Sequence, residues 1–293
     1  MLAPTIQSLV FGILIGGLFG LAAVGLSLVF GVTKFLNVSH GELLMLGGYT
    51  SFWLFTLYRV DPFVGLPLAI LALVVLGVVL YKLIFTRMVK LSDETKIKNT
   101  MLVGFGLGLV LQNVALRLWT ADDRGITTSY SSHVIQAFGV RFPVVRLISF
   151  AIAVVVLLAL QLFLKRTYTG KAIRATVQDW EAATLLGIDI HKVYLLSFVM
   201  GAGLAGLAGG LVAVGYSIKP DMGLEWTLIS LIVMVLGGLG SFVGTFVAGL
   251  AVGIAQSLTS LWLGGAYREM VALLLFLLVL VLRPQGLFGV KEG

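Results

Sequence analysis

The chain alternates between long apolar runs and short polar interruptions, a pattern that predicts membrane-spanning helices. A helix crosses the apolar core of a bilayer with about 20 consecutive apolar residues. The alternating segments of a membrane β-barrel are absent. We therefore predict an all-α integral membrane protein with about eight or nine transmembrane or half-spanning helices in one transmembrane domain over residues 1–293. The expected spans are Ile6–Phe30, Glu42–Tyr58, Phe63–Phe85, Met101–Trp119, Leu147–Leu164, Val193–Tyr216, Trp226–Leu236, Phe242–Leu263 and Met270–Leu282.

The first of two interrupted helix regions is polar. The break Asn37–Glu42 places Asn37, Ser39, His40 and Glu42 between two apolar spans. A polar group at membrane depth must face protein or water, and broken helices in transporters often line the substrate path. One interpretation is therefore a substrate pathway, in which Asn37 or Ser39 caps the helix that Glu42 begins. The alternative is a polar turn at the membrane surface with Glu42 in the first helical turn.

Glycine is unusually frequent, with 36 copies, and supports two further expectations. Glycines and alanines at four-residue spacing let helix backbones approach closely in lipid. These rows are Gly12, Gly16 and Gly20; Ala202, Gly206 and Gly210; and Gly240, Gly244 and Ala248. The second interrupted region, Leu236–Ser241, offers backbone groups but no charge. We interpret it as a gate or hinge of the pathway, with the candidate residues Gly237, Gly238 and Gly240.

Composition supports a membrane protein, and the charge pattern predicts its orientation. Hydrophobic residues make up 59% of the chain, charged residues 11%, and the mean hydropathy is +1.08. The net charge of +7 does not indicate a nucleic-acid partner, because the basic residues lie in short loops beside apolar spans. Two such loops are predicted to be cytoplasmic, one with Lys82, Arg87, Lys90, Lys96 and Lys98, and one with Lys165, Arg166, Lys171, Arg174 and Lys192.

Counting crossings from these loops orients both ends of the chain. The carboxyl-terminal segment Arg283–Gly293 is predicted to be cytoplasmic, and the amino terminus lies outside if both interrupted regions cross fully. The loop Ala121–Arg146 then lies outside, and its own arginines are a mild conflict with this topology. The expected location is a bacterial-type cytoplasmic (inner) membrane with several crossings.

Residues suited to bond chemistry do not cluster in this sequence. There is no cysteine, so a disulfide framework, a thiolate metal site and a cysteine nucleophile are excluded. His133 and His191 have no second ligand at metal spacing. The phosphate-binding pattern Gly-x-x-x-x-Gly-Lys-Ser/Thr is also missing. We therefore expect no enzyme activity, no catalytic or metal site and no cofactor bound by this chain, so that any energy must come from another subunit.

The longest polar island, Lys165–Leu196, predicts a short helix at the membrane surface. Asp179 is placed to cap its amino end, and Gly187 suits the left-handed position that ends a helix. Asp189 is placed to cap the following helix. The apolar side chains Trp180, Leu185 and Leu186 would then be exposed anchors for a partner. An ordinary interfacial helix between two spans is the alternative.

A resemblance adds to this interpretation. The stretch EAATLLG, Glu181–Gly187, is similar to the Glu-Ala-Ala-x-x-x-Gly motif of bacterial ABC import permeases, and the whole chain resembles their LivH-type branched-chain amino acid permeases. The matching stretches are Gly25–Tyr49, Gly170–Gly209, Lys219–Gly223, Val235–Gly249 and Leu282–Gly289. One departure is Val38-Ser39, where relatives usually carry Phe-Ala, so the substrate stays open. The resemblance implies a cytoplasmic coupling loop at about residues 165–192 that contacts an ATPase through Asp179, Trp180, Glu181, Ala182, Ala183, Leu186 and Gly187.

The implied function is that of a permease subunit of an ATP-driven importer for branched-chain or other apolar amino acids. The implied partners are a homologous second permease in a heterodimer, two ATP-binding subunits that hold ATP and magnesium, an extracytoplasmic substrate-binding protein and membrane lipid. The sequence leaves a homodimer, and amide or urea substrates, open. The alternative function is an ion-coupled secondary transporter of a small polar or amphipathic solute, in which His40 and Glu42 would be the ion ligands.

Overall fold

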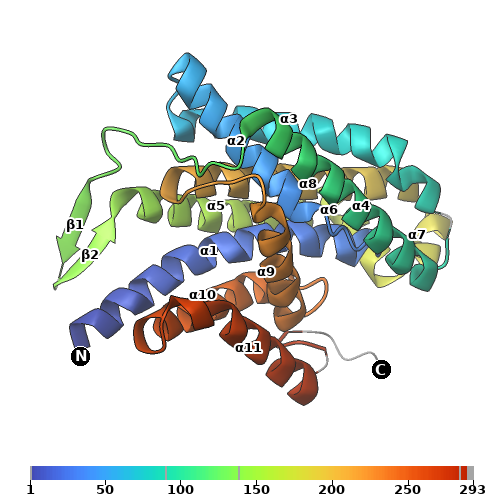
Figure 1. The fold of residues 1–293 in the computed structure, drawn as a ribbon. Coiled ribbons are helices and arrows are strands. Elements are labelled where there is room, and N and C mark those ends of the chain that lie inside the picture. Colours follow the sequence, from blue (N-terminus) through green and yellow to red (C-terminus); the bar gives the residue numbers. More distant parts are fainter. Residues whose placement is uncertain (1, 90, 138, 284, 289–293) are drawn as a thin grey trace.

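Long helices dominate a computed structural model that describes residues 2–89, 91–137, 139–283 and 285–288 (Figure 1). The long helices are α1 (Leu2–Thr33), α2 (His40–Tyr58), α3 (Pro62–Leu83), α4 (Asp93–Trp119), α5 (Val144–Arg166), α8 (Ile190–Gly215), α9 (Met222–Gly237), α10 (Phe242–Trp262) and α11 (Arg268–Leu282). The shorter elements are the helices α6 (Tyr168–Gln178) and α7 (Trp180–Leu185), the antiparallel hairpin of β1 (Val134–Ala137) and β2 (Val140–Pro143), and the 3-10 turns η1 (Phe85–Met88) and η2 (Gly265–Tyr267).

The prediction of an all-α membrane protein is confirmed. Within the described residues, seven helices are long and apolar enough to cross a membrane: α1, α3, α4, α5, α8, α10 and the helical stretch ending with α11. The 19-residue α2 and the 16-residue α9 complete the set of spanning and half-spanning helices. Most helices extend a few residues beyond the predicted spans, and the largest difference is at the start of α4. Helix α4 begins at Asp93 and not at Met101, because acidic residues in a first turn favour the positive end of a helix even where the sequence is polar.

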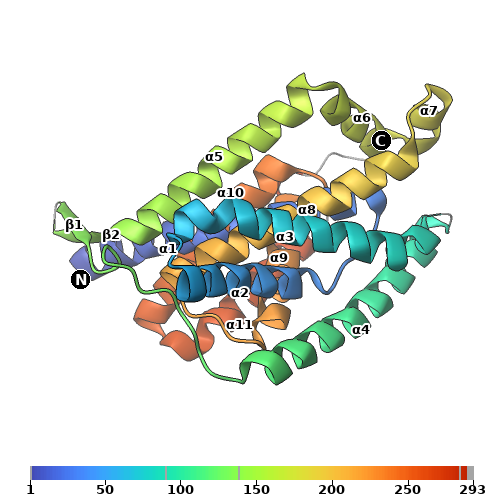
Figure 2. The ribbon, with the colours of Figure 1, turned by 90° about the horizontal axis from the view of Figure 1, so that it is seen from above.

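The hairpin β1–β2 lies at one end of the bundle, and the helices α6 and α7 of the polar island lie at the opposite end (Figure 2). At the hairpin end, Gln7 of α1 exchanges two hydrogen bonds with the backbone of Arg141 in β2, both 2.8 Å long. At the island end, which carries α6 and α7, Lys96 of α4 lies with its Nζ 5.7 Å from the centroid of the Trp180 ring. The described parts of the two basic loops therefore lie at the same end. Lys90 and residues 284 and 289–293, to which the topology prediction also refers, lie outside the described residues.

Glycines form the closest helix contacts in the core. Helices α1 and α10 run antiparallel, and a methyl group at Gly16 would overlap the backbone of α10 at Gly249 and Leu250. In the same way, Gly206 of α8 lies against α3, which leaves no room for a larger side chain. The first two predicted rows therefore pack helix backbones. The third row does not lie on one helix face, because Gly240 precedes α10 and has a left-handed conformation, with φ +83°, whereas Gly244 and Ala248 lie within α10.

Candidate functional site

The polar island folds into two short helices, of which α7 has the capping residue that the sequence predicts. Asp179 Oδ1 accepts hydrogen bonds from the backbone N–H groups of Glu181 and Ala182, both at 2.9 Å. These are two of the amide groups that a helix start leaves without an intrahelical partner. The prediction of Asp179 as the N-cap is confirmed. The preceding helix α6 was not predicted; Thr167 caps it by accepting a hydrogen bond from Gly170 N at 3.0 Å.

The carboxyl end of α7 is closed by a Schellman motif. Gly187 has φ +82°, its N–H donates to Thr184 O at 2.9 Å, and the Ile188 N–H donates to Ala183 O at 3.1 Å. The predicted left-handed role of Gly187 is confirmed. Asp189 then caps α8 by accepting from Lys192 N at 3.2 Å, and this backbone hydrogen bond, with the Lys192 side chain 3.1 Å away, lowers the pKa of the Asp189 carboxyl. Helix α7 is therefore terminated at both ends by residues of its own segment.

Helix α7 presents apolar side chains to its surroundings. Leu185 is 89% exposed, Leu186 is 82% exposed and Trp180 is 45% exposed, whereas Ala183 is buried against the body of the protein. Large apolar side chains gathered on a projecting element are typical of an interaction surface. Sequence reasoning missed one neighbour of this surface, Lys96, whose buried ammonium lies against the rings of Trp180 and Tyr194 and forms an ion pair with Asp93 at 3.0 Å. Its spacing in the sequence gave no signal of this contact.

The first break lies inside the protein. Asn37, Ser39, His40 and Glu42 are each at most 3% exposed. Three of them lie beside the middle of α4, where Gly104 is next to Asn37 and Gly108 is next to Ser39 and Glu42. These polar groups are therefore covered by protein, as a pathway-lining break requires, while the depth of the break in the membrane stays a prediction.

A side chain of α9 caps the start of α2. Thr227 Oγ1 accepts a hydrogen bond from Gly41 N at 2.8 Å and lies 3.0 Å from both Val38 O and Gly223 O, either of which it can donate to. Asn37 and Ser39 bond to each other instead, since Asn37 Oδ1 accepts from Ser39 N at 3.2 Å and from Ser39 Oγ at 2.7 Å. Ser39 therefore occupies the predicted N-cap position, but neither its side chain nor that of Asn37 makes a capping hydrogen bond to α2.

His40 and Glu42 contact different helices. His40 Nε2 lies 3.0 Å from Ala22 O of α1. The Glu42 carboxylate lies against Gly223 in the first turn of α9, and its Oε2 is buried without a hydrogen-bond partner among the described residues. Glu42 also borders a cavity of about 30 Å³ together with Val38, Phe105, Gly108, Leu109, Gln112 and Leu224.

The second break lies at the other end of α9. Gly238 has φ +99° and ends the helix, and the free carbonyls of Leu236 and Gly237 accept hydrogen bonds from the N–H groups of Leu287 at 2.8 Å and Phe288 at 3.2 Å. The two groups of predicted pathway residues are therefore not brought together, since the 16 residues of α9 separate them.

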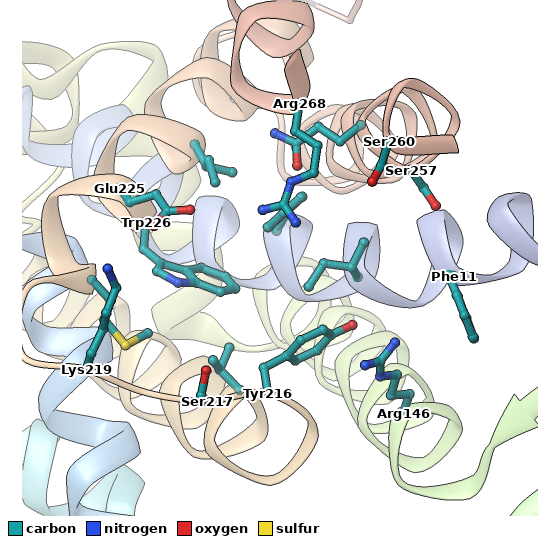
Figure 3. Close-up of a pocket in the computed structure, with 16 residues that line it drawn as sticks. Phe11, Arg146, Tyr216, Ser217, Lys219, Glu225, Trp226, Ser257, Ser260 and Arg268 are labelled. Atoms are coloured by element: carbon teal, nitrogen blue, oxygen red, sulfur yellow. The ribbon is translucent and has the colours of Figure 1, made fainter. Parts of the chain in front are cut away.

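A larger cavity lies near the hairpin end, between α1, α5, α9, α10 and α11 (Figure 3). Its volume is about 340 Å³, and its polar wall includes Arg146, Lys219, Glu225 and Arg268. Burial raises the pKa of Tyr216 in the same wall, and the charges of Arg146 and Arg268 oppose that rise. Sequence reasoning treated Arg146 only as a loop charge and overlooked the other three. The position of these charged residues at the edges of predicted spans was the feature of the sequence that could have indicated this cavity.

Seven apolar helices of spanning length among the described residues make this a multi-pass helical membrane protein, and its matches are transport permeases. The profile of the family described as branched-chain amino acid transport system, permease component, matches residues 8–280. The chain belongs to this family. It is 29% identical to the high-affinity branched-chain amino acid transport system permease protein BraD of Pseudomonas aeruginosa, over 98% of this chain and 96% of that protein.

Other relatives place the chain within a broader group of permeases. It is 27% identical to LivH of Escherichia coli, over 98% of this chain and 96% of that protein, and 25% identical to the ribose import permease protein RbsC of Haemophilus influenzae, over 92% and 82%. Among solved structures it resembles PsaBC of Streptococcus pneumoniae, with a TM-score of 0.52, 15% sequence identity and 98% of both chains covered. At that identity the likeness concerns the fold alone.

Proposed function

We propose that this chain is the transmembrane permease subunit of an ATP-driven ABC importer for branched-chain or other apolar amino acids. The observation that carries the proposal is α7, an exposed helix capped by Asp179, closed at Gly187 and bearing the Glu181-Ala182-Ala183 sequence. Because both of its ends are fixed, a force applied to its exposed leucines moves the helix as a unit. In this proposal the island end is cytoplasmic, the hairpin end faces outward, and the membrane is the inner membrane.

The remaining parts of the transporter follow from this role. Two ATPase subunits would hold ATP and magnesium and seat α7, and a homologous second permease would complete the pore. The relatives support the second permease, because the chain is similar both to LivH and, at 26% identity over 90% of its length, to LivM of Salmonella typhimurium. A substrate-binding protein would deliver the amino acid at the hairpin end.

Replacing Gly187 tests the coupling. The variant Gly187→Leu forces a branched side chain into a left-handed conformation, which costs about 1–2 kcal/mol and opens the end of α7. We expect folded protein in the membrane, with loss of substrate-stimulated ATPase activity and of uptake in proteoliposomes that contain the complete transporter.

A matched control is Gly139→Leu. Gly139 also has a positive φ, +76°, and lies in the hairpin at the opposite end of the molecule. With saturating substrate-binding protein, which would dock at this end, we expect this variant to keep ATPase stimulation. Normal uptake by Gly187→Leu, or equal losses in both variants, would contradict coupling through α7.

We also propose that the substrate passes beside the break Asn37–Glu42 and leaves near Gly237–Gly240. The support is Glu42, whose buried Oε2 lacks a partner and which borders a cavity between α2, α4 and α9. Glu42→Gln retains the shape of the side chain but removes its charge, so we expect slower uptake and altered substrate preference. A wild-type rate and preference would show that Glu42 has only a packing role.

A further inference from the structure

The cavity of Figure 3 combines one apolar wall with charges of both signs. Its apolar side includes Phe19 and Trp226, whose rings meet edge to face with their centroids 5.5 Å apart. Its charges come from separate elements, with Arg146 in α5, Glu225 in α9 and Arg268 in α11. In Figure 3 the side chains of Glu225 and Arg268 both point into the space. The cavity therefore offers an apolar surface, a carboxylate and guanidinium groups to one small molecule.

The charges in this cavity do not satisfy one another. Among the described residues, neither Glu225 nor Arg268 has an ion-pair partner within 4.0 Å. Arg146 Cζ lies 4.5 Å from the centroid of the Tyr216 ring and 5.3 Å from that of Phe11, and Arg146 has no ion-pair partner within 4.0 Å among the described residues. Lys219, in contrast, pairs with Asp221 at 3.3 Å. An unpaired carboxylate and an unpaired guanidinium facing the same space are complementary to a molecule that carries both charges itself.

The size of the cavity agrees with a small ligand. Its volume of about 340 Å³ lies in the range of roughly 300–1,000 Å³ that small-molecule sites occupy. A simple anion would leave the Glu225 carboxylate without a partner, and a simple cation would leave the arginines without one. A sugar could hydrogen-bond to these groups, but it carries no charge to neutralise either the carboxylate or the guanidinium groups. A zwitterion with an apolar side chain can pair with the carboxylate, pair with the guanidinium groups and pack against the apolar wall.

We propose that this cavity receives the free amino acid at the hairpin end, with its carboxylate on Arg268 and Arg146, its ammonium on Glu225 and its side chain against Phe19 and Trp226. This assignment rests on the proposed import function and adds a binding site upstream of the break Asn37–Glu42. It also explains why charged residues lie at the ends of three membrane helices without bonding to each other.

Cysteine labelling tests the site directly, because the chain contains no cysteine of its own. Ser260→Cys places a single thiol in the cavity wall, and Ser217→Cys provides a second reporter from another element. The complete transporter is placed in lipid nanodiscs without its binding protein, and labelling by a water-soluble maleimide is followed over time. We expect L-leucine at about ten times its Kd to slow labelling roughly tenfold, since only about a tenth of the sites then stay open.

Charge-deleted probes and variants identify each contact. L-leucinamide lacks the carboxylate and 4-methylpentanoate lacks the ammonium, so we expect both to protect the thiol far less than L-leucine does. Glu225→Gln and Arg268→Gln should each raise the concentration of L-leucine needed for protection about tenfold or more. The matched controls are Glu94→Gln in the exposed first turn of α4 and Arg117→Gln in its exposed last turn; both residues lie outside the cavity and should leave protection unchanged.

The outcomes separate this site from the proposed function. ATP-driven leucine uptake without any protection would overturn the site and leave the import function intact. Protection without ATP-driven uptake would support the site and overturn the import function. Equal protection by all three probes would show an unspecific apolar cavity, and a lack of labelling at both reporter thiols would show that the cavity is closed to water; either result overturns the proposal.

Discussion

Helix α7 and the break before α2 are both polar interruptions of an apolar chain. They differ in how far along the sequence their capping residues lie. Helix α7 takes its caps from Asp179 and Gly187, within its own segment. Helix α2 takes its cap from Thr227, which lies 186 residues further along the chain from Gly41. The first region can form its local structure by itself, whereas the second exists only once α2 and α9 have packed together.

The two regions also differ in their exposure to water. Leu185 and Leu186 of α7 are exposed, so an amide or carbonyl that loses its partner there can bond to water. The groups around Thr227 are buried, and an unsatisfied polar group there keeps its full desolvation penalty, about 1–3 kcal/mol. Changes that break the contacts of Thr227 with the start of α2 should therefore destabilise the whole protein, and changes at α7 should leave it folded but uncoupled.

The largest expected effect is that of Gly41→Ala. A methyl group at Gly41 would overlap the Gly223 carbonyl and crowd Thr227 Oγ1, and therefore separates α2 from α9. Overpacking of this kind costs about 1–3 kcal/mol or more, and the lost hydrogen bonds of Thr227 add to it. We expect a large fall in the melting temperature of the purified protein, or loss of folded protein from the membrane.

The control for this variant is Gly106→Ala in α4, where no atom lies within 4 Å of the added methyl group. Alanine favours a helix over glycine by roughly 1 kcal/mol, so stability should be unchanged or slightly higher. Equal melting temperatures for Gly41→Ala and Gly106→Ala would contradict the close packing of α2 on α9.

Thr227→Val should have the next largest effect. Valine has a similar shape but leaves Gly41 N and Val38 O without their partner, so we expect the free energy of unfolding to fall by about 1–3 kcal/mol. Thr50→Val serves as the control, because among the described residues the Thr50 hydroxyl bonds only to Leu46 O in its own helix. Thermal unfolding followed by size-exclusion chromatography compares the two, and a similar loss in both variants would refute a special role for Thr227.

This difference also explains how far the sequence could predict the molecule. The spans were visible because a membrane helix needs a long apolar run, and the caps of α7 were visible because Asp179 and Gly187 are its neighbours in sequence. Thr227 was not visible, because a threonine in an apolar helix gives no sign of which helix it will meet. The cavity with Glu225 and Arg268 was missed for the same reason: α9 and α11 become neighbours only in the fold.

The smallest effect on stability, and the sharpest test of the comparison, is expected for Asp179→Ala. The variant removes the acceptor for Glu181 N and Ala182 N, which costs an N-cap about 1 kcal/mol. Because α7 is exposed, this loss should fray one helix and leave the melting temperature of the whole protein unchanged, while substrate-stimulated ATPase activity falls. Asp179→Asn retains an oxygen acceptor in the same place and should keep most of the stimulation. Hydrogen exchange at the amides of residues 180–186 separates the two variants, and protection that is equal in both would show that the Asp179 cap does not hold α7 in place.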